Sequence, residues 1–242
     1  MATGSKPVVF DSRKEVDFVI IGSGASGGVL AKELSTAGFD VVVLEQGPYR
    51  RAGDFSHDEL SVQFLGEMTG HPSWRDPQTF RRTASETATV QTEGPPTALY
   101  ARGVGGSSVH FTANFWRLHP VDFKERSLLG GIAGTGFADW PISYEELEPY
   151  YSRVDWEIGV SGAQGPFDPP RSRPYPVPPL PLNSSGALLE KGARKLGLHA
   201  QPAPMAILSK EHNGRPPCMH CGFCMGYGLS LIHISEPTRL QV

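Results

Sequence analysis

A glycine-rich turn between a strand and a helix is the feature that most constrains this fold. Val16–Ile21 is apolar and β-branched and predicts a short buried strand. It runs into Gly22-Ser23-Gly24-Ala25-Ser26-Gly27, a helix expected over Ser26–Ala37, and a second apolar strand over Phe39–Leu44. Strand, helix and strand within about 30 residues predict a βαβ unit of a parallel sheet covered by helices. The helix should bury one face and expose another, with Leu30, Leu34 and Ala37 inward and Lys32 and Glu33 outward.

The turn has the spacing Gly-x-Gly-x-x-Gly, which in this setting favours a dinucleotide. Gly22 permits the tight turn, Gly24 lets the backbone approach a pyrophosphate, and Gly27 lets the helix pack against the strand. The phosphates would then lie on the free N–H groups of the helix N-terminus. We therefore expect Gly22, Ser23, Gly24, Ala25, Ser26 and Gly27 to bind the cofactor.

An acidic residue ends the second strand. Glu45 lies 18 residues after Gly27, near the separation of about 20 at which a carboxylate accepts hydrogen bonds from a ribose. Its charge would repel a 2′-phosphate and so disfavours NADP. The fingerprint does not separate NAD from FAD.

Composition and charge exclude several classes of protein. Hydrophobic residues are 39% and charged residues 19% of the 242 residues, an ordinary globular mixture. The net charge of −3 gives no electrostatic case for nucleic acid or an anionic membrane. No apolar run is long enough to span a bilayer. The N-terminus lacks the apolar core of a signal peptide, so we expect a cytoplasmic protein, with periplasmic co-export beside a partner as the alternative.

The middle of the chain predicts two helices separated by a proline-rich segment. Ser143-Tyr-Glu-Glu146 fits a capping box, and Pro149 should kink or split the helix that follows. Pro166–Pro181 holds eight prolines and should be extended, either as an exposed linker or wrapped across a domain surface. Asn183–Leu196 predicts a further short helix. The apolar face of the first helix should comprise Leu147, Tyr150, Tyr151 and Val154.

A second glycine-centred block follows at Tyr100–Arg117. Its Gly105-Gly106-Ser107-Ser108 run offers small residues and open N–H groups that suit close approach to a flat or anionic ligand. By composition alone the same run fits a simple tight turn equally well.

All three cysteines lie in one short run. Cys218, Cys221 and Cys224 form two consecutive Cys-x-x-Cys steps, a spacing that suits an iron–sulfur cluster or zinc. Because a fourth ligand is not evident, redox-inert buried cysteines remain the alternative.

These motifs together resemble the glucose–methanol–choline (GMC) family of flavoproteins. The resemblance rests on the fingerprint at Asp17–Gly28, on Val43-Leu-Glu-Gln-Gly47, on the Gly-Gly-Ser-Ser block, and on Asp139–Tyr151 followed by Gly159–Gly162. It covers Val16–Gly228 and is closest to flavoprotein subunits of gluconate 2-dehydrogenases and related sugar or sugar-acid dehydrogenases. It implies an α/β Rossmann-type FAD-binding domain with a parallel sheet, plus part of an inserted substrate domain.

The resemblance also implies a chemistry. Family members oxidise the CH–OH group of a sugar, sugar acid or alcohol by hydride transfer to FAD, and Gly105, Gly106 and Ser107 would lie against the flavin. Where many members carry an asparagine this chain has Val109-His110-Phe111, similar to the subgroup in which a histidine is covalently attached to flavin. A cysteine-rich segment in related dehydrogenases carries an iron–sulfur cluster, so a cytochrome or small partner subunit is expected.

No catalytic residue is assigned, because the family's catalytic histidine lies near the end of a full-length chain and nothing here matches it. The alternatives are a non-catalytic dinucleotide-binding module and an NAD-dependent dehydrogenase. Leu229–Arg239 resembles the in-frame translation of a sequencing adapter, so we set Leu229–Val242 aside and expect an inactive N-terminal fragment. The predicted organisation is an FAD-binding domain at 1–140, a helical and proline-rich segment at 141–200, a cysteine-rich segment at 201–228 and the adapter-like tail at 229–242.

Overall fold

The computed structural model describes residues 11–50, 60, 79–81, 83–90, 101–109 and 111–220. The chain divides into two compact units, and the described residues up to 109 belong to the first and those from 111 to the second. The predicted domain boundaries stay a prediction. Within the described ranges, no helix is long and apolar enough to cross a membrane.

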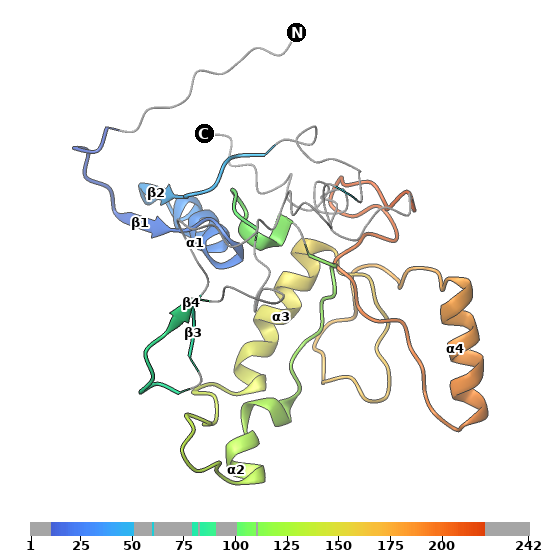
Figure 1. Cartoon of the computed structure of the whole chain (residues 1–242). Helices are drawn as coiled ribbons and strands as arrows, with labels where there is room; N and C mark the ends of the chain where they lie inside the picture. The colour runs from blue at the N-terminus through green and yellow to red at the C-terminus, as the bar shows by residue number, and fades with distance from the viewer. Residues whose placement is uncertain are drawn as a thin grey trace. The chain divides into compact units, whose positions relative to one another are not determined.

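The first unit is built on a parallel strand pair joined by a helix. Strand β1 (Phe18–Ile21) pairs with β2 (Val41–Leu44) in a register that runs from Phe18 opposite Val41 to Ile21 opposite Leu44. Helix α1 (Ala25–Thr36) connects them and packs on both strands (Figure 1). The predicted βαβ unit is confirmed, with a Rossmann-like arrangement. A short antiparallel pair, β3 (Thr79–Phe80) with β4 (Thr89–Val90), belongs to the same unit.

The prediction that the first strand is buried on both faces is wrong for the described residues. Ile20 is buried, but its neighbours Val19 and Ile21 are 57% and 88% exposed. Side chains alternate between the faces of a strand, and the described part of this sheet has a helix on one face of a two-stranded pair. Only the side chain directed at α1 is therefore covered.

The predicted inner face of α1 is also wrong in part. Ala31 is its buried residue, whereas Leu30 is 51% exposed and Ala37 is exposed. The orientation is fixed by Gly27, where an added Cβ would lie 2.0 Å from the carbonyl oxygen of Gly22. Ala31 lies one turn further along the same side of α1, so it also faces the strands and is buried.

The second unit is organised around α3 (Tyr144–Ile158), next to a 3-10 turn η4 (Pro120–Phe123) and α2 (Glu125–Leu129). The predicted capping box is confirmed, since Glu146 N–H donates to Ser143 Oγ and Ser143 N–H donates to Glu146 Oε2. Helix α3 runs unbroken past Pro149, so the predicted split is wrong. One missing N–H removes a single intrahelical bond, and side-chain contacts on either side of Pro149 hold the helix.

The buried face of α3 is polar rather than apolar. Its buried residues are Tyr144, Ser152 and Asp155, whereas the predicted core residue Tyr150 is 63% exposed. Leu147, Tyr151 and Val154 are half-buried. A local apolar pattern cannot show that a distant arginine will pack beside this face, with its guanidinium 5.3 Å from the centre of the Tyr151 ring.

That arginine is Arg117, whose side chain is buried against α3. Its five N–H groups donate five hydrogen bonds. Two go to Asp155 Oδ2, and one each goes to Glu148 Oε1, Tyr144 Oη and Ser152 Oγ. Burial alone would lower the pKa of Arg117, but these hydrogen bonds outweigh it and raise that pKa. Burial likewise would raise the pKa of Glu148, whereas hydrogen bonds from Ser152, Ser172 and Arg117 lower it to about 2.

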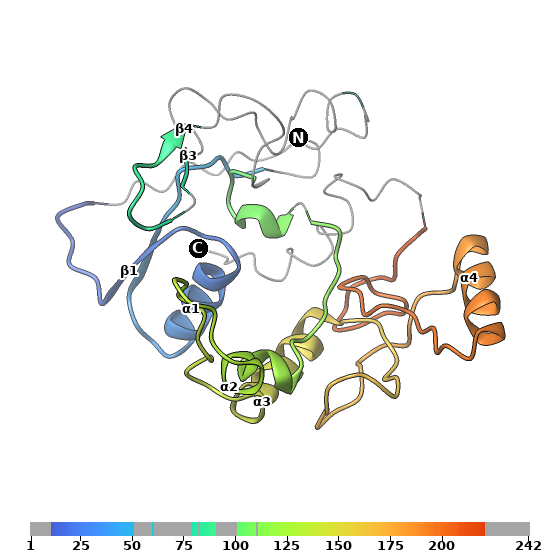
Figure 2. The same cartoon turned by 60° about the horizontal axis from the view of Figure 1, so that its bottom comes forward.

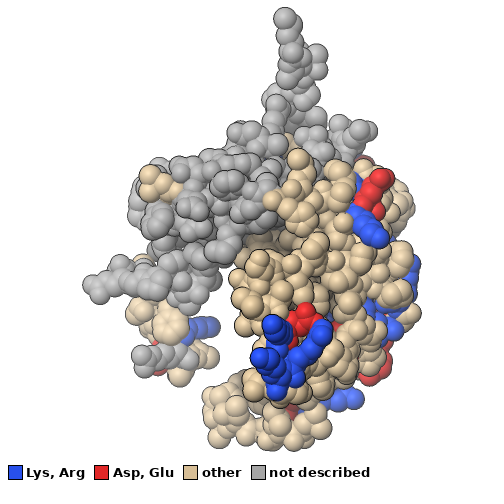
Figure 3. Space-filling view, turned by 90° about the vertical axis from the view of Figure 1, so that its right-hand side faces the viewer, with Lys and Arg blue, Asp and Glu red and all other residues tan. Residues whose placement is uncertain are grey.

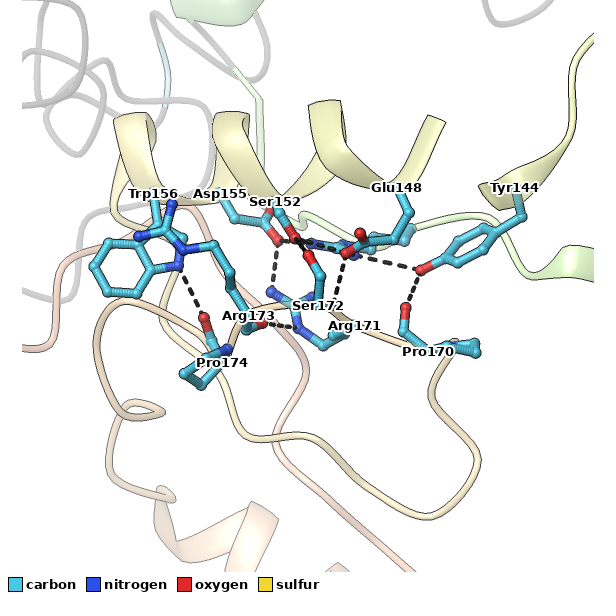
Figure 4. Close-up of polar contacts among 11 residues, drawn as sticks. Tyr144, Glu148, Ser152, Asp155, Trp156, Pro170, Arg171, Ser172, Arg173 and Pro174 are labelled. Carbon is cyan, nitrogen blue, oxygen red and sulfur yellow. Dashed lines mark hydrogen bonds and ion pairs between the residues drawn. The ribbon is translucent and has the colours of Figure 1, made fainter. Parts of the chain in front are cut away.

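The proline-rich segment is fastened across α3 by the same carboxylates (Figure 4). Arg171 Nη2 donates to Asp155 Oδ2 at 2.7 Å, and Ser172 N–H donates to Glu148 Oε1 at 2.9 Å. Further along, Trp156 Nε1 donates to the carbonyl of Pro174 at 3.0 Å, and Val177 bridges to Ser161. Of the two predicted alternatives, the segment wraps across a domain surface and is not a free linker.

Helix α4 (Ser184–Lys195) confirms the helix predicted over Asn183–Leu196, with Asn183 as its N-cap. It has no buried residue, and Figures 1 and 2 both show it standing away from α3 within the second unit. Figure 3 looks at the molecule from the side of α4 and shows basic side chains gathered beside acidic ones on a largely uncharged face.

The buried cluster of Arg117, Arg171, Asp155 and Glu148 forms a hub of ion pairs on α3. Removal of the Asp155 carboxylate tests how much this hub contributes to stability. Asp155→Ala would leave two buried guanidinium groups, those of Arg117 and Arg171, without their shared carboxylate. We expect the free energy of unfolding to fall by about 3–5 kcal/mol, as for other broken buried ion pairs. The control is Arg153→Ala, which removes an exposed ion pair with Glu157 on the same helix and should cost less than about 1 kcal/mol. Equal effects of the two variants in urea unfolding would contradict this account.

Candidate site at the two glycine segments

The two glycine segments found in the sequence meet at Ser23. The Ser23 hydroxyl donates to Glu45 Oε2 at 2.7 Å and accepts from the Gly105 N–H at 3.1 Å. The Ser23 N–H donates to the same carboxylate oxygen at 2.9 Å. One serine therefore joins the β1–α1 turn, the end of β2 and a segment 82 residues further along the chain.

The backbone after β2 runs against the second glycine block. Val104 N–H donates to the carbonyl of Pro48 at 3.1 Å. At Gly47 an added Cβ would lie 2.2 Å from the backbone nitrogen of Gly103, so no side chain fits there. Sequence reasoning did not predict this contact, although the glycine that ends Val43-Leu-Glu-Gln-Gly47 was a signal of it.

Backbone conformation explains the glycines at two further positions, and at Gly106 close approach adds to it. Gly22 has φ +89° and Gly106 has φ +58°, both in the left-handed region that favours glycine. An added Cβ at Gly106 would lie 3.1 Å from the Cα of Gly24, a distance at which one backbone must shift. The block at Gly105–Ser108 overlaps η3 (Gly106–Val109), a 3-10 turn whose first residue lies against Gly24 of the fingerprint turn.

Gly24, like Gly22 and unlike Gly27, faces open space. An added Cβ there would meet nothing within 4 Å. Gly24 is the N-cap of α1, and within the described ranges no side chain caps that helix end. The first-turn N–H groups of a helix bind anions when no side chain occupies them. The geometry therefore leaves the backbone at Gly24 open to a ligand, while the space around Gly27 and Gly47 is closed by other backbone atoms.

The Glu45 carboxylate is largely engaged by the protein itself. Oε2 accepts two hydrogen bonds from Ser23, and Oε1 accepts one from the Gly47 N–H at 2.8 Å. The hydrogen bond from the Ser23 N–H, with those from the Ser23 hydroxyl and Gly47, lowers the pKa of Glu45. A carboxylate has about four acceptor positions, so one remains, on Oε1, for an outside hydroxyl group.

The structure brings most of the predicted residues into one place in the first unit. They are Gly22, Ser23, Gly24, Ala25, Ser26, Gly27, Glu45, Gly105, Gly106 and Ser107. The hydroxyl of Ser107 accepts from the Ala101 N–H at 3.0 Å, which fixes it within its own segment. His110 lies outside the described residues.

The predicted cysteine cluster is described only at Cys218, while Cys221 and Cys224 lie outside the described residues. Cys218 N–H donates to the Leu208 carbonyl at 2.8 Å, and its sulfur accepts from the His220 N–H at 3.4 Å. Among the residues with described placement, no group of three or more His, Cys, Asp or Glu could hold a metal ion.

Comparisons with known proteins agree with this geometry. A family model described as an NAD(P)-binding Rossmann-like domain matches residues 20–64. The chain is 28% identical over 97% of its length to the gluconate 2-dehydrogenase flavoprotein of Pantoea cypripedii. It is 33% identical over 86% of its length to the fructose dehydrogenase large subunit of Gluconobacter japonicus, and 28% identical over 86% to a GMC-type oxidoreductase of Mycobacterium tuberculosis. It spans 43%, 40% and 26% of those relatives, respectively.

Fold and relatives together define the class: a Rossmann-type dinucleotide-binding fold whose sequence is similar to that of flavoprotein oxidoreductases. Within that class the chain is a GMC-type oxidoreductase homologue, as its motifs predicted.

The hydrogen bonds to Glu45 make a pH-dependent contribution to stability. A carboxyl whose pKa is lowered on folding stabilises the fold above its ordinary pKa of 4.5, and loses that effect as the pH falls through the lower folded value. We expect Glu45→Gln to lower the free energy of unfolding by about 1 kcal/mol at pH 7, a value reduced for solvent exposure. The deficit should shrink below pH 4.5. Glu15→Gln, an exposed change in the same unit, is the control for loss of one charge, and a pH-independent deficit would contradict the assignment.

Proposed function

We propose that this chain forms the FAD-binding part of an enzyme that oxidises the CH–OH group of a sugar, sugar acid or alcohol. The observation that carries the proposal is the approach of Gly106 to Gly24, which places the second glycine block against the dinucleotide turn. A turn that bound only a nucleotide would not require a segment 82 residues away to be hydrogen-bonded to it. A flavin, with a flat ring beyond its pyrophosphate, accounts for both segments.

The residues present fit FAD at three points. The open backbone at Gly24 and the uncapped first turn of α1 suit the pyrophosphate. The remaining acceptor position on Glu45 Oε1 suits one ribose hydroxyl. Gly105, Gly106 and Ser107 offer small side chains for close approach to the ring system. When bound, FAD would supply the hydride-accepting centre, which no side chain can supply.

The substrate class and partners are proposed from the relatives. Gluconate and fructose, which appear in the names of two of these relatives, both offer a hydroxyl-bearing carbon. The name "large subunit" of the fructose enzyme favours assembly with a further subunit, and a cytochrome suits the electron acceptor. We assign no catalytic base to the described residues.

The match to an NAD(P)-binding Rossmann-like model supports a second candidate, a domain that binds NAD with or without catalysis. The two functions differ in the cofactor. Retention of a yellow flavin by the purified chain, or its absorbance after FAD titration, favours the first candidate, whereas tight binding of NADH without flavin favours the second.

A pair of glycine substitutions tests the FAD site. Gly24→Ala adds a methyl group into open space at φ −64°, so it should leave the fold intact while blocking the pyrophosphate. We expect at least a tenfold weaker FAD affinity in a fluorescence titration. The control is Gly28→Ala, within the same helix, where the added Cβ makes an ordinary 3.9 Å contact. It should stabilise the helix by about 1 kcal/mol and keep FAD affinity. Unchanged affinity in Gly24→Ala would count against the site.

Two finer features extend the proposal. His110 directly follows η3 in the sequence. A bond from its imidazole nitrogen to the flavin methyl carbon would form with loss of one proton from each partner and two-electron reduction of the flavin. Cys218, Cys221 and Cys224 have the spacing of ligands to an iron–sulfur cluster that would carry electrons onward. The support for both is the sequence, since His110, Cys221 and Cys224 lie outside the described residues.

Denaturation of the FAD-loaded protein tests the flavin linkage. Flavin should remain with the unfolded chain of the wild type and be released from the His110→Ala variant. Analysis of iron and acid-labile sulfide tests the cluster, and both should be present in the wild type and lost after Cys221→Ser. All flavin in the small-molecule fraction excludes the linkage. Protein free of iron and sulfide after anaerobic reconstitution excludes the cluster.

A further inference from the structure

The second unit contains a cavity of about 200 Å³ that the FAD site does not use. Its walls come from the segment just before η4, from the proline-rich segment that wraps α3, and from Pro204. The lining residues are Trp116, Arg117, His119, Asp168, Pro169, Arg171, Tyr175 and Pro204. The cavity is smaller than the 300–1,000 Å³ typical of drug-sized ligands, so its size suits a single small ring.

Arg171 supplies hydrogen-bond donors to this cavity. Its side chain is only 2% exposed, and it is fixed by Nη2 donating to Asp155 and Nε donating to the Arg173 carbonyl at 3.3 Å (Figure 4). The guanidinium lies 3.7 Å from the centre of the Tyr175 ring, which holds it from the other face. Within the described ranges its Nη1 makes no hydrogen bond. Arg117, in contrast, has already used all five of its N–H groups.

Asp168 also lines the cavity and has acceptor positions left over. Its Oδ2 accepts from the Gly165 N–H at 2.7 Å, and its Oδ1 accepts from Gln201 Nε2 at 2.8 Å. Each oxygen of an ionised carboxylate has two acceptor positions, so each retains one. The two bonds hold the carboxylate in place without saturating it.

An aromatic side chain completes the arrangement. Trp116 lines the cavity and is 64% exposed, although the neighbouring Arg117 is buried. An exposed indole offers an apolar face with negative electrostatic potential and one N–H donor at its edge. The C–H face of a saturated ring packs well on such a surface, while the ring's hydroxyl groups remain free for hydrogen bonds.

The local charge disfavours an anionic ligand. The cavity and the side chains that hold its walls include two positive groups, the guanidinium groups of Arg117 and Arg171. They include three negative groups, the carboxylates of Asp155, Glu148 and Asp168. Arg171 and Arg117 are already neutralised by the first two carboxylates, so the remaining charge beside the cavity is that of Asp168. A neutral ligand that both donates and accepts hydrogen bonds fits this set better than a carboxylate or phosphate.

We propose that this cavity binds a neutral hydroxylated ring of one sugar unit, with Trp116 packing on its C–H face. Arg171 Nη1 then donates to one ring hydroxyl and Asp168 accepts from another. The site deepens the proposed function by naming a sugar-binding element in the second unit. Its binding does not depend on FAD.

The test is titration of the 242-residue chain with methyl α-D-glucopyranoside, followed by saturation-transfer NMR on the sugar signals. We expect saturable binding, and at least a tenfold weaker affinity after Trp116→Ala. Arg171→Lys, which keeps the positive charge but loses the planar fork, should weaken binding similarly. Phe167→Ala is the matched control, because it removes another exposed aromatic side chain, next to Asp168, that does not line the cavity.

Several outcomes would overturn the sugar site. These are no saturable binding by the wild-type chain, equal binding by Trp116→Ala, and binding of sodium gluconate in place of the neutral glycoside. The two proposals fail separately: Gly24→Ala should keep sugar binding while losing FAD, and Trp116→Ala should keep FAD while losing sugar. Loss of both ligands in either variant would contradict two independent sites.

Discussion

The Ser23 hydroxyl is the interaction on which the candidate site depends. A hydroxyl has one donor and two acceptor positions, and Ser23 uses the donor on Glu45 and an acceptor position on Gly105. Its backbone N–H binds the same carboxylate oxygen. Most acceptor positions of the Glu45 carboxylate are therefore occupied by groups of the protein itself. The hydrogen bond from Gly105 to the Ser23 hydroxyl holds the second glycine block against the first turn. The site is thus defined by backbone proximity, and side chains of the turn mainly hold the backbone in position.

The second unit has a comparable centre of a different kind. There the shared group is the Asp155 carboxylate, which is buried and accepts hydrogen bonds from both Arg117 and Arg171. A buried carboxylate between two guanidinium groups ties α3 to the segment before η4 and to the proline-rich segment. Arg171 then has two roles in our proposal, because it fastens the segment through Asp155 and also lines the cavity. Disruption of the hub would therefore alter both stability and the proposed sugar site.

Local sequence patterns predicted the elements well and their surroundings poorly. The βαβ unit, the capping box at Ser143 and the helix after Asn183 all follow from a few adjacent residues, and the structure has them. The prediction of which side chains of α1 point inward was wrong in part. The contact of Gly27 with Gly22, not apolar periodicity, sets the rotation of that helix. Pro149 did not split α3, since packing compensates for one lost backbone bond.

The interactions that build the sites join residues far apart in the chain, and sequence patterns do not show them. Ser23 and Gly105 are 82 residues apart, and Arg117 and Asp155 are 38 apart. Glycine at the end of Val43-Leu-Glu-Gln-Gly47 hinted that another backbone lies close, but not which one. The resemblance to a known family predicted that the two glycine segments act together, which composition alone left open.

The central claim is that both glycine segments contact one bound flavin nucleotide. The most direct measurement is the change in backbone amide NMR shifts of the isotope-labelled chain on titration, first with ADP and then with FAD. ADP should shift the amides of Gly22–Gly27 alone, and FAD should shift those together with the amides of Gly103–Gly106. If FAD shifts only the first segment, as ADP does, the second glycine block is a structural turn and the account is wrong.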